Sequence, residues 1–328
     1  MKNNIRVSAP GKLMLYGEHA VIYGYPCIVT AVDHRLTVSL KKTKDLFLRI
    51  NAPDVDIYGY SLPIKHLNQK LQKMPVGVRF AQTAVRNFIG KYGVELSGLS
   101  LTSKNQFSSK FGFGSSSAVT VATIKALAEI YSVKLEKKQL FDLAYKTVLD
   151  VAGVGSGFDL AAAIWGGTIY FANKGEVIET LTDQQIPLVV GYSGTKADTP
   201  ALVRQVADFR GMHTEITDSI FKNIGILVER AKNYVSAMDL KKMGELMRVN
   251  QGLLDALGVN TARLSQMIFA AVAGGAYGAK LSGAGGGDCM IACYDGINTE
   301  PIKESMHQST AIIIDDVRTG AEGVRIEA

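Results

Sequence analysis

Residues 110–122 read KFGFGSSSAVTVA, a glycine- and serine-rich loop that leads directly into a helix-forming run. Gly112 and Gly114 let the backbone turn tightly and approach a ligand closely. The apolar run that follows Ser117 predicts a helix that extends to about Tyr131. Free N–H groups and partial positive charge at the start of a helix suit an anion such as phosphate. A flexible loop with a serine N-cap is the alternative that these residues alone leave open.

A second glycine cluster, KLSGAGGGDC, occupies residues 280–289. Four glycines in the five positions 283–287 cost backbone entropy unless the backbone itself has a task. We expect this cluster to lie between a helix and the strand CMIACY, and a plain tight turn is the alternative. Because a strand follows the glycines, a dinucleotide-binding fold is disfavoured, and the P-loop pattern GxxxxGK[ST] is absent from the sequence.

Three polar residues near such segments are candidates for chemistry. Asp159, in GSGFD at 155–159, leads into the apolar run AAAIWGG, where a partly desolvated carboxylate suits a base or a metal ligand. An ordinary aspartate N-cap is the alternative. Lys12 follows Pro10-Gly11 early in a predicted strand and could reach a substrate oxygen. His19 is the most interesting of the five histidines, although a lone histidine is usually structural or exposed.

The remaining patterns mix strands and helices without strict βαβ alternation, which favours an α+β fold over a doubly wound sheet. Runs rich in β-branched and apolar residues predict strands, and apolar residues at helical spacing predict helices. The expected strands cover residues 5–9, 13–16, 27–40, 167–171, 187–192 and 311–315, and the expected helices cover 78–91, 136–149, 220–231 and the stretch from 243 to 257.

The chain has 328 residues, of which 47% are hydrophobic and 20% charged, an ordinary balance for a globular protein. Its formal net charge is +6. Its basic residues are scattered without a run of five or more, so we expect no nucleic-acid partner. No stretch approaches the roughly 18 apolar residues that span a bilayer, so we expect no membrane partner. Three cysteines without a CxxC pair are typical of a reducing compartment, and the N-terminus lacks an apolar signal segment, so we expect a cytoplasmic protein.

In this order, three segments resemble the signatures of the GHMP kinase superfamily: APGKLMLYGEHAVIYG at 9–24, KFGFGSSSAVTVA at 110–122 and KLSGAGGGDCMIA at 280–292. The resemblance implies two α+β lobes with the active site in the cleft between them. We expect an N-terminal lobe at 1–175, similar to ribosomal protein S5 domain 2 and carrying the glycine loop, and a C-terminal lobe at 176–328. It also implies a kinase that takes ATP, Mg²⁺ and a small-molecule substrate, with a homodimer as a possible assembly.

The same resemblance implies roles for individual residues. Asp159 would be the catalytic carboxylate, Lys12 the positive group near the reacting oxygen, and Ser116 a magnesium ligand. The residues implied for ATP are Lys110, Gly112, Gly114, Ser115, Ser116 and Ser117. Those implied for the acceptor are Glu18, His19, Thr199, Gly283, Ala284 and Gly285.

Within the superfamily, GEHAVIYGYP, SGTKADTPALV and MGELMRVNQGLLDALGV are most similar to mevalonate kinases, which implies transfer of phosphate to the 5-hydroxyl of mevalonate. GSGFD, KFGFGSS and GGGDC look more like phosphomevalonate kinases. Val148 and Ala197 stand where mevalonate kinases usually carry a metal-binding glutamate and an arginine. Phosphomevalonate and a sugar or sugar phosphate are alternative acceptors. A related decarboxylase and a non-catalytic binding protein are further alternatives.

Overall fold

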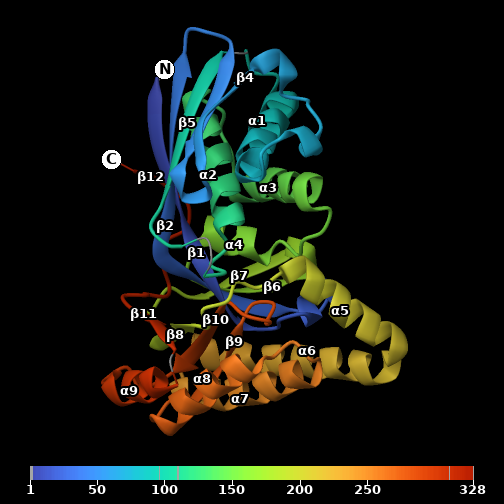
Figure 1. Ribbon diagram of the computed structural model, residues 1–328, viewed down its shortest axis with the longest axis vertical. Helices are drawn as coiled ribbons and strands as arrows, with labels where there is room; N and C mark the ends of the chain where they lie inside the picture. The colour runs from blue at the N-terminus through green and yellow to red at the C-terminus, as the bar shows by residue number, and fades with distance from the viewer. Residues whose placement is uncertain (1–2, 96, 109–110, 310, 328) are drawn as a thin grey trace.

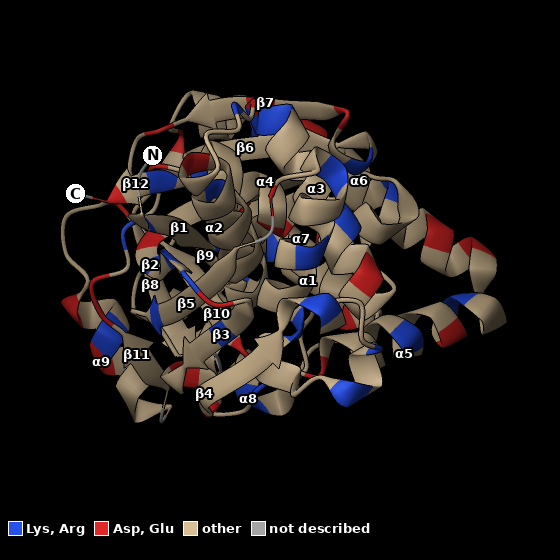
Figure 2. Cartoon of the chain, turned by 90° about the horizontal axis from the view of Figure 1, so that it is seen from above, with Lys and Arg blue, Asp and Glu red and all other residues tan. Residues whose placement is uncertain are grey.

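The protein is described by a computed structural model that covers residues 3–95, 97–108, 111–309 and 311–327. Figure 1 shows two lobes stacked along the long axis, each with a sheet on which helices pack. The expected two-lobed α+β fold is therefore confirmed. Figure 2 shows Lys and Arg interspersed with Asp and Glu along the elements of both lobes, so the net charge of +6 is not gathered in one segment.

The first lobe is built on an eight-stranded sheet in which β12, β1, β2, β5, β3 and β4 lie side by side. β6 pairs with β2 on a separate branch, and β7 pairs with β6. All described pairings are antiparallel except that of β3 with β5. The bounds are β1 (Asn4–Tyr16), β2 (Cys27–Thr43), β3 (Phe47–Ala52), β4 (Ile57–Pro63), β5 (Gly98–Asn105), β6 (Thr168–Ala172), β7 (Val177–Thr182) and β12 (Arg325–Glu327).

Four helices cover one face of this sheet: α1 (Arg79–Tyr92), α2 (Ser115–Ile130), α3 (Lys137–Ala152) and α4 (Phe158–Trp165). α2 contacts β1 and β2 as well as the other three helices, so it is buried on most sides and can be apolar almost all round. α3 begins with a reciprocal capping box between Glu136 and Gln139.

The second lobe has an antiparallel sheet in the order β11, β8, β10, β9, with several of its helices below the sheet in Figure 1 and α5 beside it. The strands are β8 (Leu188–Tyr192), β9 (Gly278–Ser282), β10 (Cys289–Cys293) and β11 (Ile312–Ile314). The helices are α5 (Thr199–Met212), α6 (Thr214–Ser236), α7 (Leu240–Ala256), α8 (Ala262–Ala273) and α9 (Glu300–Gln308). No described helix combines the length and the apolar character needed to cross a membrane.

Short 3₁₀ turns connect several elements: η1 (Ala20–Tyr23), η2 (Pro53–Val55), η3 (Ile64–His66), η4 (Leu71–Lys73), η5 (Val76–Val78) and η6 (Asn173–Gly175). The division at residues 175 and 176 stays a prediction as a domain boundary. β7 and β12 both follow residue 176, yet they hydrogen-bond to the sheet of the first lobe.

Two local expectations differ from the structure. The strands expected at 5–9 and 13–16 are one strand, β1, with an irregular register between Pro10 and Gly11. The helix expected before the glycines at 283–287 is wrong, because β9 ends directly before them. All five residues of β9 are buried, and a short, fully buried strand lacks the alternation that distinguishes it from a helix segment.

The two lobes meet where β1 approaches β9 and α7. The Ser282 hydroxyl accepts a hydrogen bond from the Met14 amide at 2.9 Å and donates one to the Met14 carbonyl at 3.0 Å. The Tyr16 hydroxyl donates to the Met243 carbonyl at 2.6 Å. These hydrogen bonds hold the end of β1, and therefore the segment around His19 that follows it, against the second lobe.

Candidate active site

The loop before α2 has the geometry expected of an anion-binding loop. Gly112 and Gly114 adopt left-handed backbone conformations with φ of 73° and 79°, which L side chains rarely adopt. Gly114 is itself the N-cap of α2, and its carbonyl accepts from the Ala118 amide at 3.0 Å. The alternative of a serine N-cap is therefore wrong, and Ser115 to Ser117 form the first turn of the helix.

Backbone contacts hold this loop against β1. The Lys12 amide donates to the Phe113 carbonyl at 3.0 Å. A Cβ at Gly11 would lie 3.2 Å from Phe113, so glycine permits this approach. The Phe113 side chain is buried beside Phe107 and Phe111, with ring centroids 5.6 and 5.8 Å away. The phosphate loop, as we name residues 111–117, is thus fixed in register with Lys12.

Lys12 and Asp159 meet beside that loop. The Lys12 Nζ lies 3.8 Å from Asp159 Oδ1, and a Cβ on Gly114 would lie 3.4 Å from Lys12 Cγ and 4.0 Å from Asp159 Cβ. Asp159 Oδ1 is buried and lacks a hydrogen-bond partner among the described residues. Lys12 is 8% exposed, and its Nζ lies 5.5 Å from the centroid of the Phe158 ring. The structure therefore brings the predicted lysine, aspartate and glycine loop together.

The segment before Asp159 is shaped by its glycines. Gly157, with φ of 91°, is the N-cap of α4, and a Cβ there would crowd Phe141 and Tyr145. The Asp159 side chain consequently sits in the first turn of α4 and does not itself cap the helix. Val148 lies close to Gly155, where a Cβ would be 3.1 Å from Val148 Cγ1, so an apolar side chain borders this segment.

Glu18 and His19 are both buried, and they face the second lobe. Glu18 is 1% exposed, and its carboxylate forms an ion pair with the fully buried Lys280 of β9. Asn250 on α7 also donates to Glu18, at 3.4 Å. Burial lowers the pKa of Lys280, and the nearby Glu18 carboxylate opposes that shift. The Glu18 carboxylate is thus engaged within the protein, and its predicted contact with the acceptor stays a prediction.

His19 is held in a left-handed conformation with φ of 60°. Its Nε2 lies 2.8 Å from the Ala284 carbonyl, which can only accept, so Nε2 carries the proton of the neutral ring. Nδ1 is then an acceptor, and it is buried without a partner among the described residues. Burial lowers the pKa of His19, which favours this neutral form.

The glycines at 283–287 form a turn between β9 and β10 that packs tightly against other segments. A Cβ on Gly285 would lie 2.2 Å from the Val259 carbonyl, which accepts from the Gly286 amide at 2.8 Å. Gly283 and Gly285 have φ of 111° and 80°. The glycines thus form a tight turn between two strands, and the Ala284 carbonyl in this turn reaches His19. Their part in binding the acceptor stays a prediction.

Thr199 is exposed at the first position of α5, after the N-cap Asp198. Lys110 lies outside the described residues. Sequence reasoning missed Asp288, which closes the site from the second lobe: its Oδ1 accepts from the Ala197 amide at 2.9 Å, and a Cβ on Gly112 would lie 2.5 Å from its Oδ2. Burial raises the pKa of Asp288. The only sequence signal was its place after the glycines.

Comparison with known proteins agrees with this arrangement. Residues 79–167 match the GHMP kinases N terminal domain, and residues 215–310 match the GHMP kinases C terminal domain. A mevalonate kinase of Pyrococcus abyssi is 35% identical over 100% of this chain and 99% of its own. One of Thermococcus sibiricus is 34% identical, with 98% of each chain covered. The crystal structure of the Methanococcus jannaschii mevalonate kinase superposes with a TM-score of 0.83 at 24% identity, covering 96% of this chain and 98% of that one. The chain belongs to the GHMP kinases and, within them, to the mevalonate kinase family.

Proposed function

We propose that this protein transfers the γ-phosphate of ATP to the 5-hydroxyl of mevalonate. The observation that carries the proposal is the convergence of Lys12, Asp159 and Gly114 at the start of α2. Phosphoryl transfer depends on positioning and on neutralising charge more than on covalent chemistry. A cation and a carboxylate beside a helix start that suits phosphate supply these requirements.

The donor side would use the backbone. The amides at the start of α2, with the hydroxyls of Ser115, Ser116 and Ser117, bind the phosphates of ATP. Asp159 accepts the proton of the attacking hydroxyl, for which its Oδ1 is available because no described residue donates a hydrogen bond to it. Lys12, 3.8 Å from that oxygen, stabilises negative charge on the hydroxyl as it is deprotonated.

We further infer that Mg²⁺ accompanies ATP. The hydroxyl of Ser116, in the first turn of α2 beside the proposed phosphate site, is an oxygen ligand of the kind that this hard cation prefers. When bound, the ion neutralises phosphate charge. Val148 offers no ligand at the position where a glutamate is usual, and Mg²⁺ commonly retains several waters in such sites.

The acceptor side would use His19, Thr199 and the turn at 283–285. The His19 Nδ1 is a buried acceptor that a substrate hydroxyl can satisfy. Ala284 fixes the tautomer of that ring through its carbonyl, so the turn acts on the acceptor indirectly. Thr199 stands exposed at the start of α5, where its hydroxyl is free to contact a ligand.

The test is a steady-state assay of ADP release with mevalonate, phosphomevalonate and galactose as acceptors. We expect the highest kcat/KM for mevalonate. The loop around Ala197 supplies few cations for a second phosphate, which arginine and lysine normally bind. A clear preference for phosphomevalonate would overturn the acceptor, and ADP release with stoichiometric CO₂ would identify a decarboxylase. A homodimer stays a prediction, which light scattering can decide.

A further inference from the structure

The C-terminal segment returns from the second lobe to the first and ends at the edge of the large sheet, beside β1 (Figure 1). We name residues 318–327 the C-terminal strap. The Thr319 hydroxyl donates to the Ile186 carbonyl at 2.9 Å, and the Ala321 carbonyl accepts from the Gly167 amide at 2.8 Å. The strap ends as β12, which pairs with β1. It therefore joins both lobes, through the Thr319 hydroxyl on one side and through backbone hydrogen bonds on the other.

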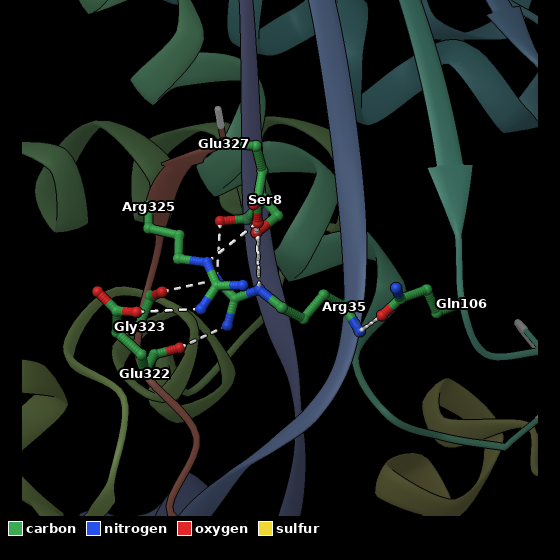
Figure 3. Close-up of polar contacts among 7 residues, drawn as sticks. All are labelled: Ser8, Arg35, Gln106, Glu322, Gly323, Arg325 and Glu327. Atoms are coloured by element: carbon green, nitrogen blue, oxygen red, sulfur yellow. Dashed lines mark hydrogen bonds and ion pairs between the residues drawn. The ribbon is translucent and has the colours of Figure 1, made fainter.

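Arg35 binds the strap from inside the sheet, as Figure 3 shows. Only 6% of Arg35 is exposed. Its guanidinium donates to the carbonyls of Glu322 and Gly323, both at 2.7 Å, and to the Ser8 hydroxyl at 2.6 Å. A third carbonyl, that of Ser8, accepts at 3.1 Å. Burial lowers the pKa of Arg35 to about 10, so the side chain remains charged near neutral pH. A planar fork of donors is suited to binding several acceptors at once.

Arg35 stands at the edge of an irregularity in β2. In the pairing of β1 with β2, Pro10 faces Arg35 and Gly11 faces Val32, which leaves Asp33 and His34 as a bulge in β2. The strap binds this bulge as well. The Asp33 amide donates to the Arg318 carbonyl at 2.9 Å, and the Arg318 amide donates to Asp33 Oδ1 at 3.0 Å.

The other side of the bulge touches the phosphate loop. The His34 ring meets the Phe113 ring edge-on, with centroids 6.0 Å apart. The Arg35 amide donates to Gln106 Oε1 at 3.0 Å, and the Gln106 amide donates to the Arg35 carbonyl at 3.0 Å. Gln106 is followed by Phe107, whose ring packs on Phe113. A chain of direct contacts thus runs from the strap through the bulge to the phosphate loop.

We propose that Arg35 is a positioning residue for ATP: by binding the C-terminal strap, it holds the β2 bulge and, through Gln106 and Phe113, the phosphate loop. The inference rests on the proposed function of that loop. It predicts that weakening the strap contact impairs nucleotide binding, although Arg35 is not among the residues proposed to bind ATP. Acceptor binding should change little, because Glu18 and His19 are fixed by separate contacts with the second lobe.

The test compares Arg35→Lys and Arg35→Met with Arg325→Gln. Arg325 belongs to the same cluster but pairs with the side chains of Glu322 and Glu327, so it is the matched control. Isothermal titration measures the Kd for MgATP, and hydrogen exchange measures how well the amides of residues 111–118 are protected. Both are carried out well below the melting temperature of each variant. We expect Arg35→Met to raise the Kd for MgATP about tenfold, Arg35→Lys less, and Arg325→Gln hardly at all. Exchange at 111–118 should accelerate in the same order, with the KM for mevalonate nearly constant.

A second variant guards against loss of folding. Gln106 is exposed, so Gln106→Ala should stay folded while it removes the side-chain bond to the Arg35 amide. We expect a smaller rise in the Kd for MgATP and faster exchange at 111–118. Unchanged exchange and Kd in folded Arg35 and Gln106 variants would overturn the inference. If the wild type did not bind MgATP, the proposed function would fall, and exchange at 111–118 would still decide whether Arg35 holds the loop.

Discussion

The phosphate loop and the acceptor side of the site are held in place by different kinds of interaction. Backbone conformation and backbone hydrogen bonds shape the phosphate loop: Gly112 and Gly114 adopt left-handed conformations, and the Phe113 carbonyl accepts from the Lys12 amide. The acceptor half, as we name Glu18, His19 and their partners, is held by side chains: buried Glu18 pairs with buried Lys280, and His19 donates to the Ala284 carbonyl. The first is almost free of charge, whereas the second buries an ion pair completely.

This difference separates binding from stability. A glycine change in the phosphate loop alters where the backbone can approach an anion, so its effect should fall on nucleotide affinity. Removing one partner of a buried ion pair leaves an uncompensated charge, so its effect should fall on the free energy of unfolding. Variants of each half should therefore fail in different assays.

The largest effect is expected for Lys280→Met. It leaves the Glu18 carboxylate buried at 1% exposure without its cation, and loss of a partner of this kind costs about 3–5 kcal/mol. Urea denaturation measures the change. The double variant Glu18→Gln/Lys280→Met should recover much of the loss, because neither charge is then buried. Lys303→Met, which breaks the more exposed pair with Asp315, should cost at most about 1 kcal/mol. Equal stability of Lys280→Met and the wild type would break the comparison.

Asp159→Asn comes next and tests the point where the two halves meet. We expect kcat to fall by at least about 10²-fold, the usual scale for a general base. MgATP affinity should change little, because the phosphate loop is held by backbone contacts. Asp142→Asn is the control, since Asp142 is a carboxylate of α3 that pairs with Lys138. A kcat near that of the wild type would remove Asp159 from the mechanism.

The phosphate loop and the helix after it could largely be predicted from the sequence. Their determinants are local: glycines, serines and an apolar helix lie within residues 110–130, and their physical meaning depends on neighbours in the chain. The helices α1, α2 and α3 were likewise predicted to within a few residues, because their apolar positions repeat at helical spacing.

The acceptor half could not be assembled from local pattern. Glu18 and Lys280 are 262 positions apart, and the Asn250 contact spans 232 positions, so only the folded chain brings them together. The strand β9 is buried on both faces, so its sequence lacks the alternation of apolar and polar residues that indicates a strand. The left-handed backbone conformations of His19 and Asp288 are likewise not indicated by the local sequence. Resemblance to the GHMP kinases supplied roles for Glu18 and His19, but it did not supply their partners.

Gly114→Val should have a smaller effect, confined to nucleotide binding. Valine is strained at φ of 79°, and its Cβ would lie in contact with Lys12 Cγ at 3.4 Å, so its methyl groups would occupy space beside Lys12. We expect the Kd for MgATP to rise about tenfold or more, which calorimetric titration measures. Gly93→Val is the control for backbone strain, because Gly93 also has positive φ, of 57°, and no atom within 4 Å of its would-be Cβ. Unchanged affinity in a folded Gly114→Val would show that the loop is only a turn.

The smallest effect is a pH dependence that belongs to the acceptor half alone. Because burial lowers the pKa of His19 in the folded state, the unfolded chain binds more protons once pH falls below its ordinary value of about 6.5. Stability from the neutral ring is therefore complete above that pH and declines on acidification toward the folded pKa, by at most about 1.4 kcal/mol per pH unit.

His19→Asn isolates this contribution. Asparagine tolerates the left-handed conformation at φ of 60° and does not titrate, but its shorter side chain does not replace the Nε2 donor to the Ala284 carbonyl. The difference in unfolding free energy between wild type and variant should shrink from pH 7 to pH 5, whatever its value at neutral pH. The Glu18 carboxylate opposes the shift, so adding Glu18→Gln to both proteins should make the difference shrink more steeply. Parallel stability curves would mean that His19 is protonated as readily in the folded protein as in the unfolded chain. The acceptor half would then be open to water, and the contrast with the phosphate loop would fail.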